Sequence, residues 1–190
     1  MNFICSGALR LIKNLPGRIT MNLYIVRHAI AVEAGTPAYE DDNLRPLTEK
    51  GKKKMQKIAQ GLKQQETELN LILTSPYLRA METAKILRNA FDLEKGAVIE
   101  TEHLVPLGHG NELISLINEK YAVVGNIALV GHEPSLGILI SMLIAGDPNL
   151  SLTLKKGSVC RLTADNLQYG RCATLDWLLT PSQLAGLGES

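Results

Sequence analysis

Two arginines and two histidines of this chain follow apolar segments in a way that suits the binding of an anion. Arg27 and His28 come directly after the segment LYIV, and His132 comes directly after NIALVG. Arg79 follows a third apolar segment, LNLIL, at the start of a helical pattern. Guanidinium groups match phosphate oxygens with paired N–H donors, and an imidazole can attack phosphorus. These residue types predict phosphoryl transfer, in which one histidine attacks while the other groups stabilise charge on the phosphoryl oxygens.

Arg79 is expected at a position that is electrostatically unfavourable for a cation. A helix predicted over residues 78–91 begins just after Pro76, so Arg79 occupies its first turn, at the positive end of the helix dipole. We therefore expect a fixed anion beside Arg79, and phosphate fits this requirement. The sequence shows no cluster of cysteines, histidines and carboxylates with the spacing of metal ligands, so we expect neither a metal nor another cofactor.

The order of the expected elements explains how these residues meet. From Met21 onward, strand-like and helical patterns alternate, which is typical of parallel strands joined by crossover helices. The expected fold class is α/β: a three-layer sandwich with a mostly parallel sheet, flanking helices, and an antiparallel edge of two or three strands within residues 152–180. The carboxyl ends of parallel strands line one crevice, which brings the candidate residues together. The predicted strands cover 23–28, 69–75, 97–99 and 126–131, and the predicted helices begin near Thr48 or cover 78–91, 111–119 and 134–145.

Composition and charge limit the partners of the protein. A chain of 190 residues, 45% of them hydrophobic, suits one compact domain, which we place at residues 21–190. Lys and Arg number 20 against 19 Asp and Glu, a net charge of +1, so no overall field favours nucleic acid or an anionic membrane. The longest apolar stretch, residues 136–146, falls short of the ~20 residues of a membrane-spanning helix. We expect neither nucleic acid nor a membrane as a partner.

Residues 1–20 are expected to form an N-terminal extension outside the fold. They carry three basic residues and no acid, break at Pro16-Gly17, and precede a second methionine, Met21. The basic residues interrupt the apolar ones, which argues against a secretory signal, and we favour translation from a start upstream of Met21. The three cysteines are widely spaced and form no CxxC pair, which indicates a reducing compartment. We expect a cytoplasmic protein.

Three motifs occur in an order that resembles a known family. LYIVRHA, TSPYLRAMETA and LVGHEP resemble the histidine phosphatase superfamily, whose fold is phosphoglycerate mutase-like. The segment RPLTEKGK at 45–52, the short chain and the ending LDWLLTP are most similar to the SixA-type phosphohistidine phosphatases, over about residues 21–181.

This resemblance implies a role for each candidate. His28 is the implied nucleophile, which forms a phosphohistidine intermediate, and the phosphoryl group is held by Arg27, Arg79 and His132. Arg45 is implied to be a secondary phosphate or substrate contact near the rim of the site. Ala29 stands where the family motif usually has glycine, which requires a backbone conformation that alanine tolerates.

The general acid has no single counterpart in this sequence. Larger members of the superfamily carry an acidic residue that protonates an alkoxide leaving group, and the candidates here are Glu133, Glu102 and Glu33. A phosphorylated imidazole leaves more easily than an alkoxide, so a site without a strong acid suits P–N bonds. The connections are too short for a capping lid, and an open site admits a histidine on a protein surface.

We therefore expect a phosphohistidine phosphatase that acts on a histidine-phosphorylated protein and releases inorganic phosphate. Such a partner is a phosphotransfer domain or a phosphocarrier in signalling. One alternative is a small-molecule phosphomonoesterase of the same superfamily or a mutase-like enzyme, which needs an efficient acid and a closable pocket. Another is a phosphate-recognising module without turnover, which needs the arginines but not the nucleophile.

Overall fold

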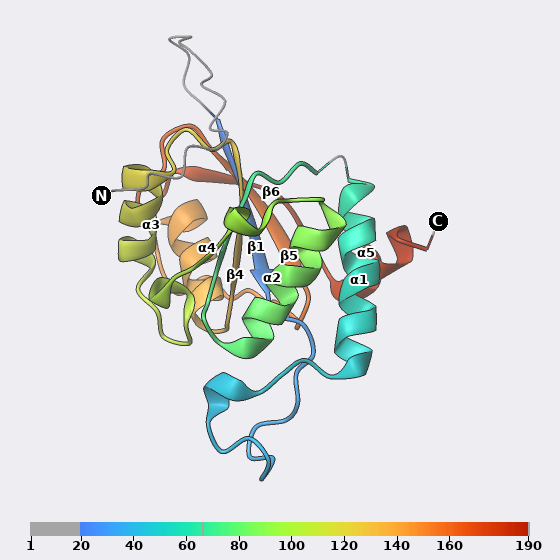
Figure 1. The fold of residues 1–190 in the computed structure, drawn as a ribbon. Helices are drawn as coiled ribbons and strands as arrows, with labels where there is room; N and C mark the ends of the chain where they lie inside the picture. Colours follow the sequence, from blue (N-terminus) through green and yellow to red (C-terminus); the bar gives the residue numbers. More distant parts are fainter. Residues whose placement is uncertain (1–19, 66, 190) are drawn as a thin grey trace, which may run out of the picture.

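A computed structural model describes residues 20–65 and 67–189 and shows a six-stranded sheet between two layers of helices (Figure 1). The strand order is β3-β2-β4-β1-β5-β6. The strands are β1 (Met21–Arg27), β2 (Leu71–Thr74), β3 (Val98–Glu100), β4 (Asn126–Gly131), β5 (Val159–Ala164) and β6 (Ala173–Leu179). The α-helices are α1 (Glu49–Lys63), α2 (Leu78–Ala90), α3 (Gly110–Lys120), α4 (Ser135–Ala145) and α5 (Pro181–Leu187). The expected α/β three-layer sandwich with a mostly parallel sheet is confirmed.

Each face of the sheet has its own apolar core. On one face, Ile117 of α3 and Ile140 of α4 are fully buried against the strands. On the other face, Met55 of α1, Ala84 of α2 and Leu184 of α5 are fully buried. Because the central strands are covered on both sides, their sequences read as continuous apolar segments rather than as alternating patterns.

Three parallel strands end at the same level of the sheet. Arg27 at the end of β1 pairs in register with Gly131 at the end of β4. Thr74 at the end of β2 pairs with Val130. The pairing continues one residue beyond β1, because the His28 N–H donates to the Gly131 carbonyl at 3.0 Å. The residues that directly follow these three strands therefore lie at one edge of the sheet.

The segment between β1 and α1 returns to this edge and contains a short 3₁₀-helix, Asp42–Leu44. Thr48 caps α1, since its hydroxyl accepts from the Gly51 N–H at 2.9 Å, and its own N–H donates to the Ile30 carbonyl at 3.0 Å. A Cβ added to Gly51 would lie 2.0 Å from the Ile30 oxygen. Glycine at this position therefore allows the first turn of α1 to pack against the segment that leaves the site.

The C-terminal part has the expected antiparallel edge, which consists of two strands: β5 pairs with β1, and β6 pairs with β5 and is the outermost strand. It differs from the prediction in one respect, because the sequence pattern leaves α5 unpredicted although the start of this helix carries strong local signals. Thr180 and Gln183 form a capping box, and Pro181 occupies the first helical turn.

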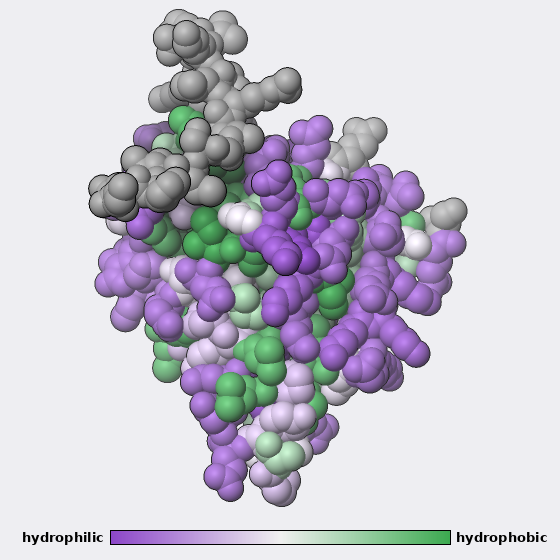
Figure 2. Space-filling view, viewed as in Figure 1, coloured by the Kyte–Doolittle hydropathy of each residue, from purple (hydrophilic) through white to green (hydrophobic). Residues whose placement is uncertain are grey.

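The expected N-terminal extension over residues 1–20 lies outside the described residues except for Thr20, so the domain boundary stays a prediction. No helix in the described part of the chain is long and apolar enough to cross a membrane. Hydrophilic side chains cover the outer face of α1 (Figure 2), which agrees with the lysine-rich sequence of this helix.

Candidate active site

One cavity at the carboxyl edge of the parallel strands brings the predicted residues together. Its volume is about 320 Å³, and its lining comes from Arg27, His28, Glu33, Ala34, Arg45, Arg79, Pro106, His132, Glu133 and Lys156. This set contains both predicted histidines and all three predicted arginines. Glu102, one of the three candidate acids, is exposed in the 3₁₀-helix Glu102–Leu104 and does not line the cavity.

His28 is held with one ring nitrogen free for chemistry. Its Nδ1 lies 2.7 Å from the Ala29 carbonyl oxygen, which can only accept, so Nδ1 carries the proton and Nε2 keeps a lone pair. The side chain is 6% exposed. Burial lowers the pKa of His28 to about 3, with the charges of Arg79 and Arg27 acting in the same direction and the hydrogen bond to Ala29 opposing them. His28 is therefore a neutral imidazole at neutral pH, and Nε2 can act as a nucleophile.

The backbone after His28 is tied to α2. The Ala29 N–H donates to the Thr83 hydroxyl at 3.0 Å, and that hydroxyl donates to the Arg79 carbonyl at 2.7 Å. Among the described non-glycine residues, a positive φ occurs only at Asp92 and Leu107. Ala29 thus adopts a conformation open to any L-residue, and the alanine in place of the family's usual glycine introduces no backbone strain.

His132 faces His28 across the site. The two ring centroids are 5.0 Å apart, and His132 Nε2 lies 3.0 Å from the Ser75 hydroxyl at the end of β2. His132 Nδ1 is buried without a hydrogen-bond partner among the described residues. Burial lowers the pKa of His132 to about 3, with added repulsion from His28 and Arg79. The second histidine is therefore neutral as well, with one nitrogen available to an added ligand.

Arg27 and Arg79 each keep one buried donor unused. The Arg27 Nη1 donates to the Leu154 carbonyl at 2.6 Å. Arg79, which is 3% exposed, donates from Nη1 to the Asp42 carbonyl at 2.7 Å and from Nη2 to Asp42 Oδ2 at 2.8 Å. In both arginines Nε is buried and has no partner in the described part of the chain. The anion expected beside Arg79 is present within the protein itself, as the carboxylate of Asp42.

Arg45 lines the cavity but directs its donors to the protein. Its Nε and Nη2 approach Asp42 Oδ1 at 2.7 Å and 2.6 Å, and its Nη1 donates to the Val32 carbonyl at 2.6 Å. Burial works against ionisation of Asp42, but the hydrogen bond from Arg45 and the charge of Arg79 together lower the pKa of this carboxyl. Asp42 is thus a carboxylate at neutral pH, shared by two arginines.

Glu133 is the best placed of the three candidate acids. It is half-buried, and its Oε1 is buried without a partner among the described residues. Burial raises the pKa of Glu133, while the charge of Arg27 and a hydrogen bond from Gly137 oppose this shift. Glu33 lines the cavity from an exposed position, and Glu102 does not reach it.

Sequence reasoning did not assign Asp42, Ser75 or Lys156 to the site. Asp42 carried one local signal, because it precedes Arg45 by three residues in the segment after β1. Ser75 directly follows β2, so the rule that locates His28 applies to it too. Lys156 lines the cavity from the segment before the antiparallel strand β5, to which that rule does not apply.

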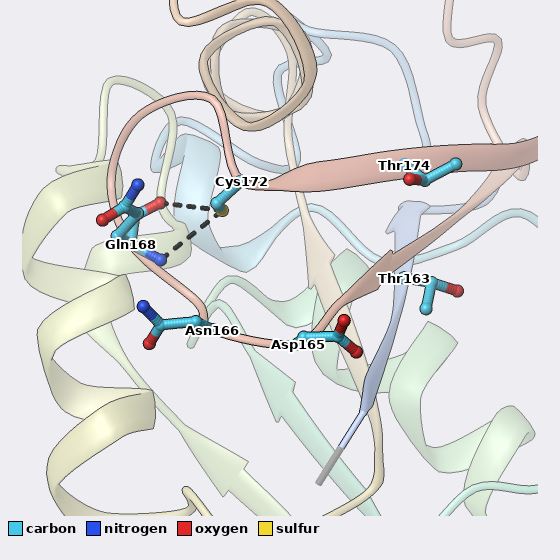
Figure 3. A pocket seen from close by; sticks show the side chains of 6 residues that line it. All are labelled: Thr163, Asp165, Asn166, Gln168, Cys172 and Thr174. Atoms are coloured by element: carbon cyan, nitrogen blue, oxygen red, sulfur yellow. Dashed lines mark hydrogen bonds between the residues drawn. The ribbon is translucent and has the colours of Figure 1, made fainter. Parts of the chain in front are cut away.

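Another cavity of about 320 Å³ lies elsewhere on the sheet, and its lining contains no histidine and no arginine (Figure 3). There the Cys172 thiol donates to the Gln168 carbonyl at 3.1 Å, and the Gln168 N–H donates to the sulfur at 3.5 Å. Its lining consists of Thr163, Asp165, Asn166, Gln168, Cys172 and Thr174. The pairing of Met21 with Ala164 puts it near the amino end of β1, away from His28. Within residues 20–65 and 67–189, no group of three or more histidines, cysteines and carboxylates could hold a metal ion.

Known proteins are similar to this chain in sequence and in fold. The family described as histidine phosphatase superfamily (branch 1) matches residues 23–106. The phosphohistidine phosphatase SixA of Escherichia coli is 29% identical over 169 residues, which cover 86% of this chain and 96% of that protein. A phosphohistidine phosphatase SixA homolog of Haemophilus influenzae is 35% identical over 130 residues, which cover 65% of this chain and 77% of that protein. The solved structure of the protein histidine phosphatase SixA complexed with tungstate has a TM-score of 0.69 and 26% identity, covering 86% of this chain and 99% of that one.

Proposed function

The chain belongs to the histidine phosphatase superfamily, and we propose that this phosphatase hydrolyses the P–N bond of a phosphohistidine carried by another protein. The observation that supports this most directly is the state of His28: a neutral imidazole whose Nδ1–H is held by a backbone carbonyl, next to two arginines with unused buried donors. The similarity to the phosphohistidine phosphatase SixA of Escherichia coli and to its homolog in Haemophilus influenzae supports the choice of bond.

The reaction proceeds in two displacements at phosphorus. In the first, His28 Nε2 forms a bond to phosphorus while the bond from phosphorus to the substrate imidazole breaks, and that imidazole leaves as a neutral ring that keeps the proton already on its other nitrogen. In the second, water attacks the phosphorylated His28, the P–Nε2 bond breaks, and inorganic phosphate is released. Throughout, the Nδ1–H of His28 stays hydrogen-bonded to the Ala29 carbonyl, so the ring keeps its orientation between the two steps.

The phosphoryl oxygens are stabilised by donors that are unpartnered in the free protein. The Nε atoms of Arg27 and Arg79 are buried and carry fixed positive charge. His132 contributes Nδ1–H when Ser75 donates to its Nε2, which leaves the neutral ring one donor for a phosphoryl oxygen. Donors fixed before the reaction stabilise the developing charge without reorganisation.

Glu133 is our candidate for the proton donor to the leaving group. Burial raises the pKa of Glu133 and leaves one of its oxygens unpartnered, and both features favour a carboxyl that donates a proton. This feature favours a second function, a phosphomonoesterase, because an alkoxide leaving group needs such an acid more than an imidazole does. The two functions differ in what the loss of Glu133 does to the reaction.

The test is phosphate release from a histidine-phosphorylated phosphotransfer protein, compared with a panel of small phosphate esters. We expect the protein substrate to be preferred by orders of magnitude. His28→Ala should abolish turnover, whereas His103→Ala, a matched change outside the cavity, should retain it. A preference for an ester assigns the second function, and turnover by His28→Ala rules out the covalent route. The roles in cytoplasmic signalling and as a partner of phosphocarriers stay predictions.

A further inference from the structure

Asp42 holds the most buried arginine of the site, Arg79, by only one edge of its guanidinium. The Arg79 Nη1 donates to the Asp42 main-chain carbonyl and the Nη2 to the Asp42 carboxylate, and both contacts lie on the terminal edge of the group. A guanidinium also has a side edge, formed by Nε and the second proton of Nη2. The Nε of Arg79 is buried and unpartnered in the described part of the chain. Asp42 thus leaves free the one edge that can still take two phosphoryl oxygens.

Asp42 is itself fixed from the opposite side. Arg45 contacts Oδ1 and Arg79 contacts Oδ2, so each carboxylate oxygen of Asp42 forms an ion pair with one arginine. Arg45 is anchored in turn by the Val32 carbonyl. The side chains of Arg79 and Arg45 are 4% and 11% exposed, against 50% for Asp42. The contacts therefore run without a break from the backbone after β1, through Arg45 and Asp42, to the first turn of α2.

We infer that Asp42 is a positioning residue, which locks the terminal edge of Arg79 so that the Nε edge meets the transferred phosphoryl group. This inference rests on the proposed function. Charge is compatible with it: Asp42 and the two arginines that it contacts, Arg79 and Arg45, together keep one net positive charge. Asp42 therefore does not cancel the positive charge beside the expected phosphoryl group.

The opposite role for Asp42 makes a different prediction. A carboxylate that merely fills the phosphate position must be displaced by the ligand, so its removal strengthens phosphate binding. A positioning carboxylate is needed in the complex, so its removal weakens phosphate binding. The sign of the change in phosphate affinity separates the two.

The test compares Asp42→Asn with Asp41→Asn. Asp41 accepts from the Asn43 N–H at 2.9 Å and caps the same 3₁₀-helix without contacting an arginine in the described part of the chain. Binding of inorganic phosphate, titrated by calorimetry, and kcat/KM for phosphohistidine are measured for both variants. For Asp42→Asn we expect a loss of about 10- to 100-fold in each, because small misplacements of a charged donor have effects of this size. Asp41→Asn should stay within about twofold.

A double variant tests whether Asp42 acts through Arg79. In an Arg79→Gln background, Asp42→Asn should cause no further loss, because interactions that share one partner are not additive. Asp42→Glu, which keeps the charge but changes the length of the side chain, should also weaken phosphate binding and supplies the test if Asp42→Asn does not fold. Tighter or unchanged phosphate binding in Asp42→Asn, an equal loss in Asp41→Asn, or a full additional loss in the double variant would overturn the inference. Phosphate binding needs no turnover, so the absence of phosphohistidine hydrolysis by the wild type refutes the proposed function alone.

Discussion

Acidification should destabilise this protein through its two buried histidines. The pKa values of His28 and His132 fall from 6.5 to about 3 on folding. Below pH 6.5 the unfolded chain binds protons that the folded chain rejects, so stability is full above pH 6.5 and is lost as pH falls toward 3. In this range the contribution of each histidine to the free energy of unfolding falls by about 1.4 kcal/mol per pH unit. Between pH 7.5 and pH 5.0 this amounts to about 2 kcal/mol per residue, or about 4 kcal/mol for the pair.

Urea unfolding followed by circular dichroism at pH 7.5, 6.5 and 5.0 measures this loss. The double variant His28→Asn/His132→Asn should have a much flatter profile, whereas His103→Asn/His109→Asn, outside the cavity, should follow the wild type. Asp42 contributes little in this window, because its pKa is lowered from an ordinary value of 3.8. Parallel profiles for the wild type and the double variant of the site would refute the reasoning, since the two histidines would then titrate alike in both states.

Three further changes test other contacts of the site. Thr83→Val leaves the buried Ala29 N–H without its acceptor and should lower the free energy of unfolding, measured in urea titrations, by about 1–3 kcal/mol. The control Thr174→Val, at an exposed position, should change the free energy of unfolding by no more than about 0.5 kcal/mol. Equal losses in the two variants would contradict this prediction. Glu133→Gln should reduce ester turnover by about tenfold or more and leave phosphohistidine turnover within a few-fold, and an equal loss in both kinetic assays would assign Glu133 to both reactions. Arg79→Lys keeps the charge but loses the paired donors, so calorimetry should show phosphate affinity reduced by about tenfold or more, and unchanged affinity would show that charge alone suffices.

The positions of His28, His132 and Ser75 follow from rules that need only strand patterns and chain order. Parallel strands covered on both faces are recognisable as apolar runs, and their carboxyl ends lie at one edge whatever the connecting segments do. The helix that contains Arg79 was also predictable from the sequence, because its start follows from Pro76 and from the spacing of the apolar residues. It was therefore predictable in outline that these side chains would lie together at one edge of the sheet.

The contacts of Asp42 were not predictable in the same way. Its partner Arg79 lies 37 residues later, and the segment that carries Asp42 has no regular period from which the direction of a side chain could be inferred. The electrostatic argument that Arg79 needs an anion was sound, but it left open whether a ligand or the protein supplies that anion. Only the three-dimensional path of the segment decides between them, and it places a carboxylate on one edge of the guanidinium.

In the proposed mechanism the same positive charges serve both phosphate binding and the nucleophile. Arg27 and Arg79 would attract the phosphoryl group, and together with burial they disfavour a proton on His28. A histidine with an ordinary pKa near 6.5 would be partly protonated around neutral pH and would lose its lone pair in that fraction of molecules. In the proposed mechanism, burial and the same arginines suppress this protonation, so His28 would stay available as a nucleophile without a separate general base. Neutral imidazoles also add no positive charge, so binding of the phosphoryl group would rely on the arginines and Lys156 that line the cavity.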